Sequence, residues 1–104
     1  MEIKFFDDSI EEFISSLEKF TILKVFRTID LLEQFGHRLG MPHSKRLTQN
    51  IFELRIRGIQ EVRLLYTFYD GRAMILYGFI KKSEKLPTRH LKTAVTRRRA
   101  LDDR

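Results

Sequence analysis

The sequence predicts an α+β fold in which two N-terminal helices and a short C-terminal helix pack on a small antiparallel, or mixed, sheet. Apolar residues in the first third of the chain recur at the three- and four-residue spacing of amphipathic helices. Residues 52–80 alternate with the period of two that is typical of strands, and Asp70-Gly71 between two such runs is a strong hairpin signal. The length of 104 residues fits one domain spanning residues 1–104.

The N-terminal elements follow from short-range signals. Residues 1–6 contain the run EIKFF and predict a strand. Ser9 and Glu12 have the spacing of a capping box, so a helix is expected to begin at Ser9. A second helix is expected over residues 21–39, with Gly40 as its C-terminal cap. The stripes expected to face the core are Ile10, Phe13, Ile14, Leu17 and Phe20 in the first helix, and Ile22, Val25, Phe26, Ile29, Leu32, Phe35 and Leu39 in the second.

The hairpin turn at Asp70-Gly71 fixes an expected strand register, because a two-residue turn pairs residues that are equally distant from it. Residues 87–104 predict a short C-terminal helix with Thr88 as its cap and Leu91, Ala94, Val95 and Leu101 facing inward. The expected strand pairs are Arg63 with Gly78, Leu65 with Leu76, and Val62 with Phe79, and the face expected to receive the helices holds Val62, Leu64, Tyr66, Phe68, Ala73, Ile75, Tyr77 and Phe79.

The opposite face of the sheet gathers cationic side chains. If residues 58–60 form a three-residue loop, Arg55 lies directly opposite Arg63, and Glu53 lies opposite Leu65. The same alternation adds Lys82 to this face, with Lys81 on the helical side or at the rim. Apolar Met74, Leu76 and Ile80 are expected to share this open face with the cations.

Composition narrows the class of protein. The chain has no cysteine, which excludes a disulfide framework, a thiolate zinc site and a cysteine nucleophile. We expect no membrane span, no secretory signal and a cytoplasmic location, since apolar runs are short. The net charge of +6 is uneven, with −1 on residues 1–52 and +7 on residues 53–104. Such an asymmetry favours a polyanionic partner for the second half.

The facing arginines Arg55 and Arg63 are the most informative feature. Like charges directly opposed across strands are destabilising by a few tenths of a kcal/mol to about 1 kcal/mol. A local rule broken without compensation indicates a functional site. In the alternative interpretation, of equal weight, the arginines extend into water or pair with Glu53 and Glu61. The residues alone leave both open.

A cluster of Arg55, Arg63, Lys82 and Glu53 suits phosphate chemistry. Guanidinium groups bind phosphate oxygens through two hydrogen bonds and can stabilise the charge of a phosphoryl-transfer transition state without a metal. RNA carries its own nucleophile, the 2′-OH, so a ribonuclease needs only to orient it, accept its proton and neutralise charge. Three accounts of the proton transfer stay open. Glu53 could accept the proton, although nearby cations would make it a weak base; His90 could accept it; or no side chain acts as a strong base.

The remaining basic residues are candidates for binding, not for catalysis. His37, His43 and His90 lack zinc-ligand spacing, so no metal is expected. Basic residues at the predicted rim and on the C-terminal helix are expected to contact RNA phosphates, although cations near a helix C-terminus also compensate the helix dipole. These RNA-binding candidates are Lys45, Arg46, Lys81, Lys85, Arg97 and Arg98.

Four short motifs occur in order along the chain: LGMPHSKRL, FELR, VRLLYTFY and GFIKKSEKLP. Together they resemble the RelE/ParE toxin superfamily, in its HigB-like, phage-related branch, over residues 20–100. The resemblance implies a RelE-like fold and the toxin of a type II toxin–antitoxin pair that cuts mRNA on the ribosome. It implies an antitoxin, the ribosome and mRNA as partners, and no cofactor.

By position, the resemblance places the phosphate-contacting arginine at Arg63 and basic site residues at Arg55 and Lys82. Glu53 stands where some relatives carry Lys, and His90 is the candidate for the Tyr or His that some relatives have beyond the last strand. Two alternatives remain: a non-enzymatic, ParE-like poison of DNA gyrase, and a nucleic-acid-binding accessory domain without toxicity. The basic cluster favours the ribonuclease.

Overall fold

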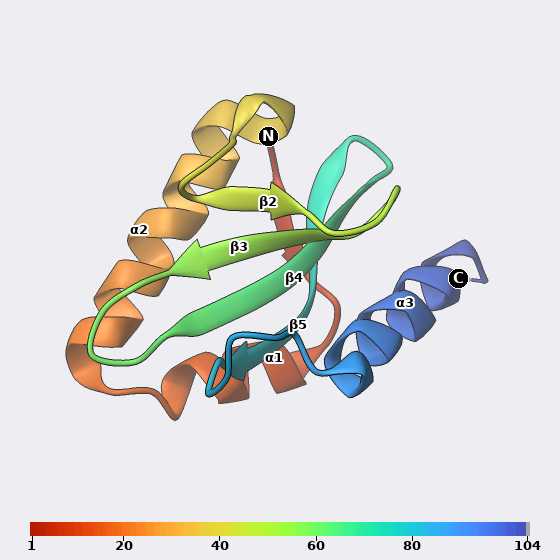
Figure 1. Cartoon of the computed structure of the whole chain (residues 1–104). Coiled ribbons are helices and arrows are strands. Elements are labelled where there is room, and N and C mark those ends of the chain that lie inside the picture. The colour runs from red at the N-terminus through yellow and green to blue at the C-terminus, as the bar shows by residue number, and fades with distance from the viewer. Residues whose placement is uncertain (104) are drawn as a thin grey trace.

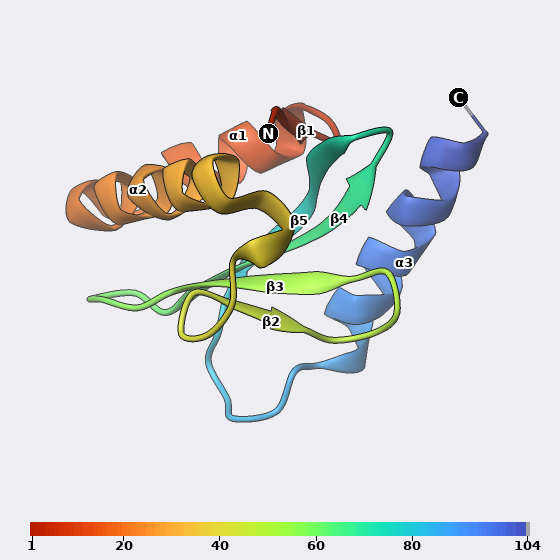
Figure 2. The same ribbon diagram turned by 90° about the horizontal axis from the view of Figure 1, so that it is seen from above.

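The computed structural model describes residues 1–103, in which a five-stranded mixed sheet lies between helices on both faces (Figure 1, Figure 2). β1 runs parallel to β5, and the other neighbouring strands are antiparallel. The predicted α+β class is therefore confirmed. In spatial order the strands are β1 (Ile3–Phe5), β5 (Arg72–Ile80), β4 (Val62–Tyr69), β3 (Phe52–Ile56) and β2 (Ser44–Arg46).

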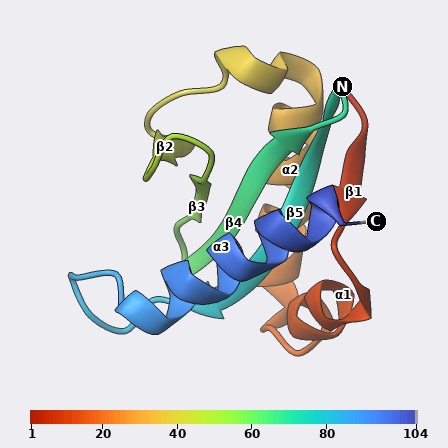
Figure 3. The same ribbon diagram turned by 90° about the vertical axis from the view of Figure 1, so that its right-hand side faces the viewer.

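The helices divide between the two faces of the sheet. α1 (Asp8–Ser15) and α2 (Lys19–Phe35) cover one face, and a short 3-10 turn, Gly36–Arg38, follows α2. α3 (Thr88–Asp102) crosses the other face over β4 and β5 and leaves β2 and β3 uncovered on that side (Figure 3). Within residues 1–103, no helix combines the length and the apolar character that a membrane crossing requires.

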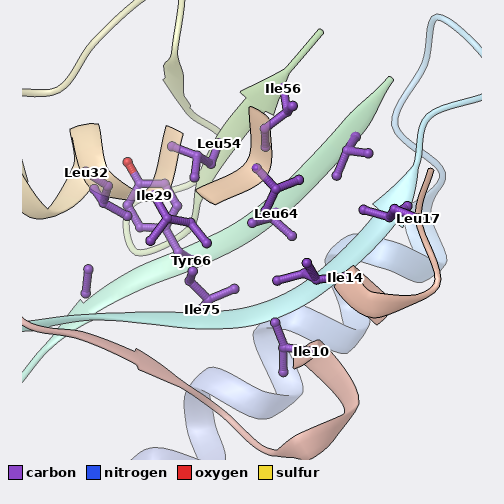
Figure 4. Close-up of a cluster of buried hydrophobic side chains, with 13 residues drawn as sticks. Ile10, Ile14, Leu17, Ile29, Leu32, Leu54, Ile56, Leu64, Tyr66 and Ile75 are labelled. Atoms are coloured by element: carbon purple, nitrogen blue, oxygen red, sulfur yellow. The ribbon is translucent and has the colours of Figure 1, made fainter. Parts of the chain in front are cut away.

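Each face of the sheet has its own hydrophobic core. The larger core lies between the sheet and α1 and α2 (Figure 4), and the smaller lies beneath α3. Both faces of β4 and β5 are therefore buried. The larger core holds Ile10, Ile14, Leu17, Val25, Ile29, Leu32, Leu54, Ile56, Val62, Leu64, Tyr66, Ala73 and Ile75, and the smaller holds Ile51, Leu65, Leu76, Phe79, Ala94 and Leu101.

The helix boundaries differ from those expected. α1 is capped by Asp7, whose Oδ1 accepts from the backbone N–H of Ser9 at 2.9 Å, so the predicted start at Ser9 is wrong. A carboxylate at this position also interacts favourably with the helix dipole. α2 ends at Gly36, not Gly40, because Gly36 adopts a φ of +53°, which few other residues tolerate. α3 begins as predicted, but Pro87 rather than Thr88 is its cap residue, and Arg104 lies outside the described residues.

Three aromatic residues predicted to face the core are exposed instead. Phe20, Phe26 and Phe35 are 61%, 47% and 39% exposed. Thr21 and Thr28 take inner positions of α2, and the Thr28 hydroxyl donates to the carbonyl of Lys24 at 2.8 Å, which satisfies it within the helix. The hydropathy stripe correctly placed Val25, Ile29 and Leu32 in the core, but it missed the buried threonines and extended too far around the helix.

A β-bulge in the β4–β5 pair changes the expected register. Next to the turn the pairs are as predicted, with Tyr66 opposite Ile75. The register shifts between Leu65 and Tyr66, so Arg63 lies opposite Phe79. Because both faces of these strands are buried, alternation of polar and apolar residues could not reveal the extra residue. The predicted pairs Arg63–Gly78, Leu65–Leu76 and Val62–Phe79 are wrong; Gly78 pairs with Leu64, Tyr77 with Leu65, and Ile80 with Val62.

The bulge also reassigns side chains to faces. Tyr77 and Phe79 pack in the α3 core instead of beneath α1 and α2, and Ile80 packs against the larger core. Gly78 packs against the α1 side of the sheet. A Cβ at this position would lie 2.6 Å from Cδ2 of Phe13, so the glycine makes room for an α1 side chain.

Candidate functional site

The predicted arginine pair is present at the edge of the α3-covered face. Arg55 on β3 and Arg63 on β4 are direct cross-strand partners, and Glu53 lies opposite Leu65, as predicted. Glu53 and Arg63 are buried, with 5% and 2% of their surfaces exposed, and the Arg55 side chain is 13% exposed. Three ionisable groups thus share one nearly dry site.

Glu53 lies between the two arginines. Its Oε1 is 3.5 Å from Nε of Arg55 and 3.7 Å from Nε of Arg63. Arg63 also donates through Nη1 to Oε2 of Glu61 at 3.2 Å and to the carbonyl of Val62 at 3.1 Å. The arginines therefore pair with Glu53 and Glu61 and do not extend into water.

These pairs leave hydrogen-bonding capacity unused. Within residues 1–103, Nε of Arg55 and Nε of Arg63 are buried without a hydrogen-bond acceptor, although both lie near the same carboxylate oxygen. Buried donors without an acceptor cost about 1–3 kcal/mol each, so such groups call for an explanation. The nearest acceptor to both Nε atoms is Oε1 of Glu53, which lies 3.5 and 3.7 Å from them.

A surface cavity of about 350 Å³ opens onto this pair. The expected Lys82 does line it, and so does Lys81, whose backbone N–H donates to the carbonyl of Glu61 at 2.7 Å. Five cationic side chains against two carboxylates make the wall predominantly positive. The lining residues are Arg55, Arg57, Glu61, Arg63, Lys81, Lys82, Ser83 and Glu84.

His90 lies beside this cavity rather than in it. It lines a second hollow of about 330 Å³ that shares Lys81 and Lys82 with the first. Its ring stacks on Phe79 with centroids 3.9 Å apart, and its Nδ1 lies 3.0 Å from the hydroxyl of Tyr77. Burial, followed by the nearby charge of Arg89, lowers the pKa of His90, so the ring is neutral at pH 7. Sequence reasoning missed Tyr77 because the bulge moved it to this face.

The remaining RNA-binding candidates are dispersed. Lys45 is exposed on β2 opposite Glu53, and Lys85 is exposed in the segment between β5 and α3. Arg46 instead closes the β2–β3 loop by donating to the carbonyls of Thr48 and Gln49.

The two α3 candidates make contacts within the fold: Arg97 joins α3 to β5, and Arg98 lies over the ring of Tyr69 on β4. Arg97 donates to the carbonyl of Leu76 at 2.6 Å and lies over the rings of Phe6 and Tyr77, whereas Arg98 pairs with Asp102 at 3.2 Å. Neither lines the two cavities.

No cluster of three or more His, Cys, Asp or Glu side chains within residues 1–103 is arranged to hold a metal ion. A sequence model of the family described as "Phage derived protein Gp49-like (DUF891)" matches residues 12–99. No curated protein matches the chain.

Proposed function

The chain belongs to the Gp49-like family of phage-derived proteins, and on this basis we propose that it is the toxin of a type II toxin–antitoxin system. Membership of this family supports the general class of toxin–antitoxin toxin. We further propose that it is a ribosome-dependent, metal-independent mRNA endonuclease of the HigB-like branch. Its partners would be a cognate antitoxin, the ribosome and mRNA.

The observation that carries this proposal is the cationic cavity that Arg55 and Arg63 line together with Lys81 and Lys82, with the two arginines held side by side by Glu53. Guanidinium N–H groups at fixed positions match the oxygens of a phosphodiester. The surrounding lysines attract a polyanion. A gyrase-binding poison would not require such donors to be held in a nearly dry site.

The reaction that suits this site uses the RNA itself as nucleophile. The 2′-oxygen attacks the adjacent phosphorus, the bond from phosphorus to the 5′-oxygen breaks, and a 2′,3′-cyclic phosphate and a 5′-hydroxyl result. Arg55 and Arg63 stabilise the negative charge that develops on the phosphoryl oxygens. No oxidant, reductant or co-reactant is consumed.

Glu61 is the group that a phosphate would replace. Its carboxylate contacts Nη1 of Arg63 at 3.2 Å, and its side chain is 42% exposed, so it can swing into water. Glu53 is buried and stays between the arginines, where it keeps the two cations together. The site thereby exchanges a mobile carboxylate for a phosphate.

The proton transfers have weaker candidates. Neutral His90 and the Tyr77 hydroxyl are linked to each other next to the cavity, and the ring is in the protonation state that a base needs. We propose that His90 is auxiliary and that electrostatic stabilisation by Arg55, Arg63 and Lys82 supplies most of the rate.

Induction of the gene in bacteria tests the function. We expect growth arrest accompanied by new mRNA 5′ ends inside coding regions, with DNA supercoiling by purified gyrase unaffected. Arg55→Ala should abolish the new 5′ ends, while Lys92→Ala on the exposed side of α3 should not. Gyrase inhibition without mRNA cleavage would identify a gyrase poison and refute the proposal.

A further inference from the structure

The outer side of α2 carries an apolar stripe that nothing in the described chain covers. Phe20, Leu23 and Phe26 follow one another at three-residue intervals and are 61%, 56% and 47% exposed. α2 and α1 together form the outer layer on their side of the sheet (Figure 2). Single exposed apolar residues are ordinary, but a contiguous group on one helix indicates a binding surface.

The apolar residues expected on the open face with the cations are not available to a partner. Met74 and Leu76 pack beneath α3, and Ile80 packs against the larger core, so the arginine face offers little free apolar area. Of the large apolar side chains that are exposed, the α2 stripe gathers three on one element. The larger exposed apolar surface therefore lies on the opposite face of the sheet.

A cationic hollow borders the stripe. It has a volume of about 310 Å³ and lies between α2 and the end of β3. Lys24 and Arg27 of α2 and Arg57 after β3 line it, whereas no carboxylate does. Lys24 also donates to the carbonyl of Arg57 at 3.0 Å, which fixes its ammonium group there. The remaining lining residues are Thr28, Pro42, His43 and Ile56.

We propose that the α2 stripe (Phe20, Leu23 and Phe26) and the adjacent hollow bind an amphipathic, acidic helix of the antitoxin. Apolar side chains at helical spacing would pack against the stripe, and flanking carboxylates would pair with Lys24, Arg27 and Arg57. The inference rests on the proposed toxin function and adds the location and chemistry of its partner. The apolar stripe lies on the face opposite Arg55 and Arg63, and Arg57 lines both the hollow beside the stripe and the cationic cavity.

Charge argues against a second copy of this chain as the occupant. An antiparallel pairing of two α2 helices centred on Leu23 would place Phe20 opposite Phe26 and Lys19 opposite Arg27 at both ends. Two like-charge contacts and a net charge of +6 per chain oppose that assembly. An acidic helix has the complementary charge.

The test uses the 104-residue chain co-expressed with the protein encoded by the adjacent gene. Leu23→Asp and Arg27→Glu change exposed positions and should leave circular dichroism and Tm unchanged. Lys92→Glu on α3 is the matched charge-reversal control. The readouts are the Kd of the purified pair, growth arrest by each variant alone, and relief of that arrest by the partner.

We expect Leu23→Asp and Arg27→Glu to arrest growth as wild type does but to escape relief, with a Kd at least about 30-fold weaker, because each loses a buried apolar or charge-pair contact. Lys92→Glu should behave as wild type. A Kd within about threefold of wild type for both variants would overturn the inference and leave the toxin function standing.

Other outcomes also decide the matter. If the wild-type chain is a dimer and Leu23→Asp is a monomer, the stripe binds a second copy of the chain. If Leu23→Asp or Arg27→Glu loses mRNA cleavage but still binds the partner, the stripe contacts RNA or the ribosome instead. Absence of both growth arrest and a complex in the wild type would refute the proposed function together with this inference.

Discussion

Replacing Glu53 with glutamine isolates the electrostatic cost of the arginine pair. Glutamine has nearly the same shape, so packing is preserved while the charge between Arg55 and Arg63 is removed. Glu53 is 5% exposed and contacts both guanidinium groups at 3.5 and 3.7 Å. Removing one partner of a buried ion pair costs about 3–5 kcal/mol. Arg63 retains Glu61 and Arg55 is partly exposed, so we expect a loss of about 2–4 kcal/mol.

The loss is measured by thermal and urea unfolding of Glu53→Gln at pH 7. For a domain of this size, each kcal/mol lowers Tm by roughly 4–8 °C. Glu61→Gln is the matched control, because its half-exposed carboxylate forms a pair worth about 0–1 kcal/mol. If Glu53→Gln is no more destabilising than Glu61→Gln, Glu53 does not hold the arginines together.

The remaining predictions concern the cavity, the histidine and the bulge. Glu61→Gln should lower KM for ribosome-bound mRNA by about three- to tenfold, since the phosphate then displaces no charged carboxylate; an unchanged KM would contradict the exchange. Burial and Arg89 lower the pKa of His90, so the unfolded chain protonates first as pH falls below about 6.5 and the free energy of unfolding declines. Urea unfolding at pH 7.5 and 5.5 should therefore show a smaller loss of unfolding free energy for His90→Gln than for wild type. An equal loss in the two proteins would refute the assignment to His90. Gly78→Ala should cost about 1–3 kcal/mol in urea unfolding, because its Cβ would meet Phe13 at 2.6 Å, whereas tolerance would indicate that α1 can shift.

Local signals in the sequence were sufficient for most of the fold. The Asp70-Gly71 turn, the alternation in β3 and the apolar spacing of α3 each have a short-range cause, and each is confirmed. The pairing of Arg55 with Arg63 followed from loop length alone. The sequence does not predict β2, because its three residues, SKR, are all polar.

Features that depend on packing from both sides could not be predicted. The extra residue in β5 is accommodated because α1 and α2 bury one face and α3 the other. Without that knowledge, Tyr77 could not be placed beside His90, nor Gly78 beneath Phe13. The sequence did offer Glu53 and Glu61 as partners of the arginines, but it left open whether the arginines pair with them or extend into water, which the packing of the sheet decides.

The central claim is that the guanidinium of Arg63 stabilises the transition state of RNA cleavage. The most direct measurement is the single-turnover rate of cleavage of ribosome-bound mRNA by wild type and Arg63→Lys, with the 3′ ends of the products analysed. Lysine keeps the positive charge but cannot reproduce the two-pronged donor. We predict 2′,3′-cyclic phosphate ends from wild type and a rate lower by about 10²–10³ in a folded Arg63→Lys protein. Equal rates for the two proteins, or no cleavage by wild type, would contradict the claim.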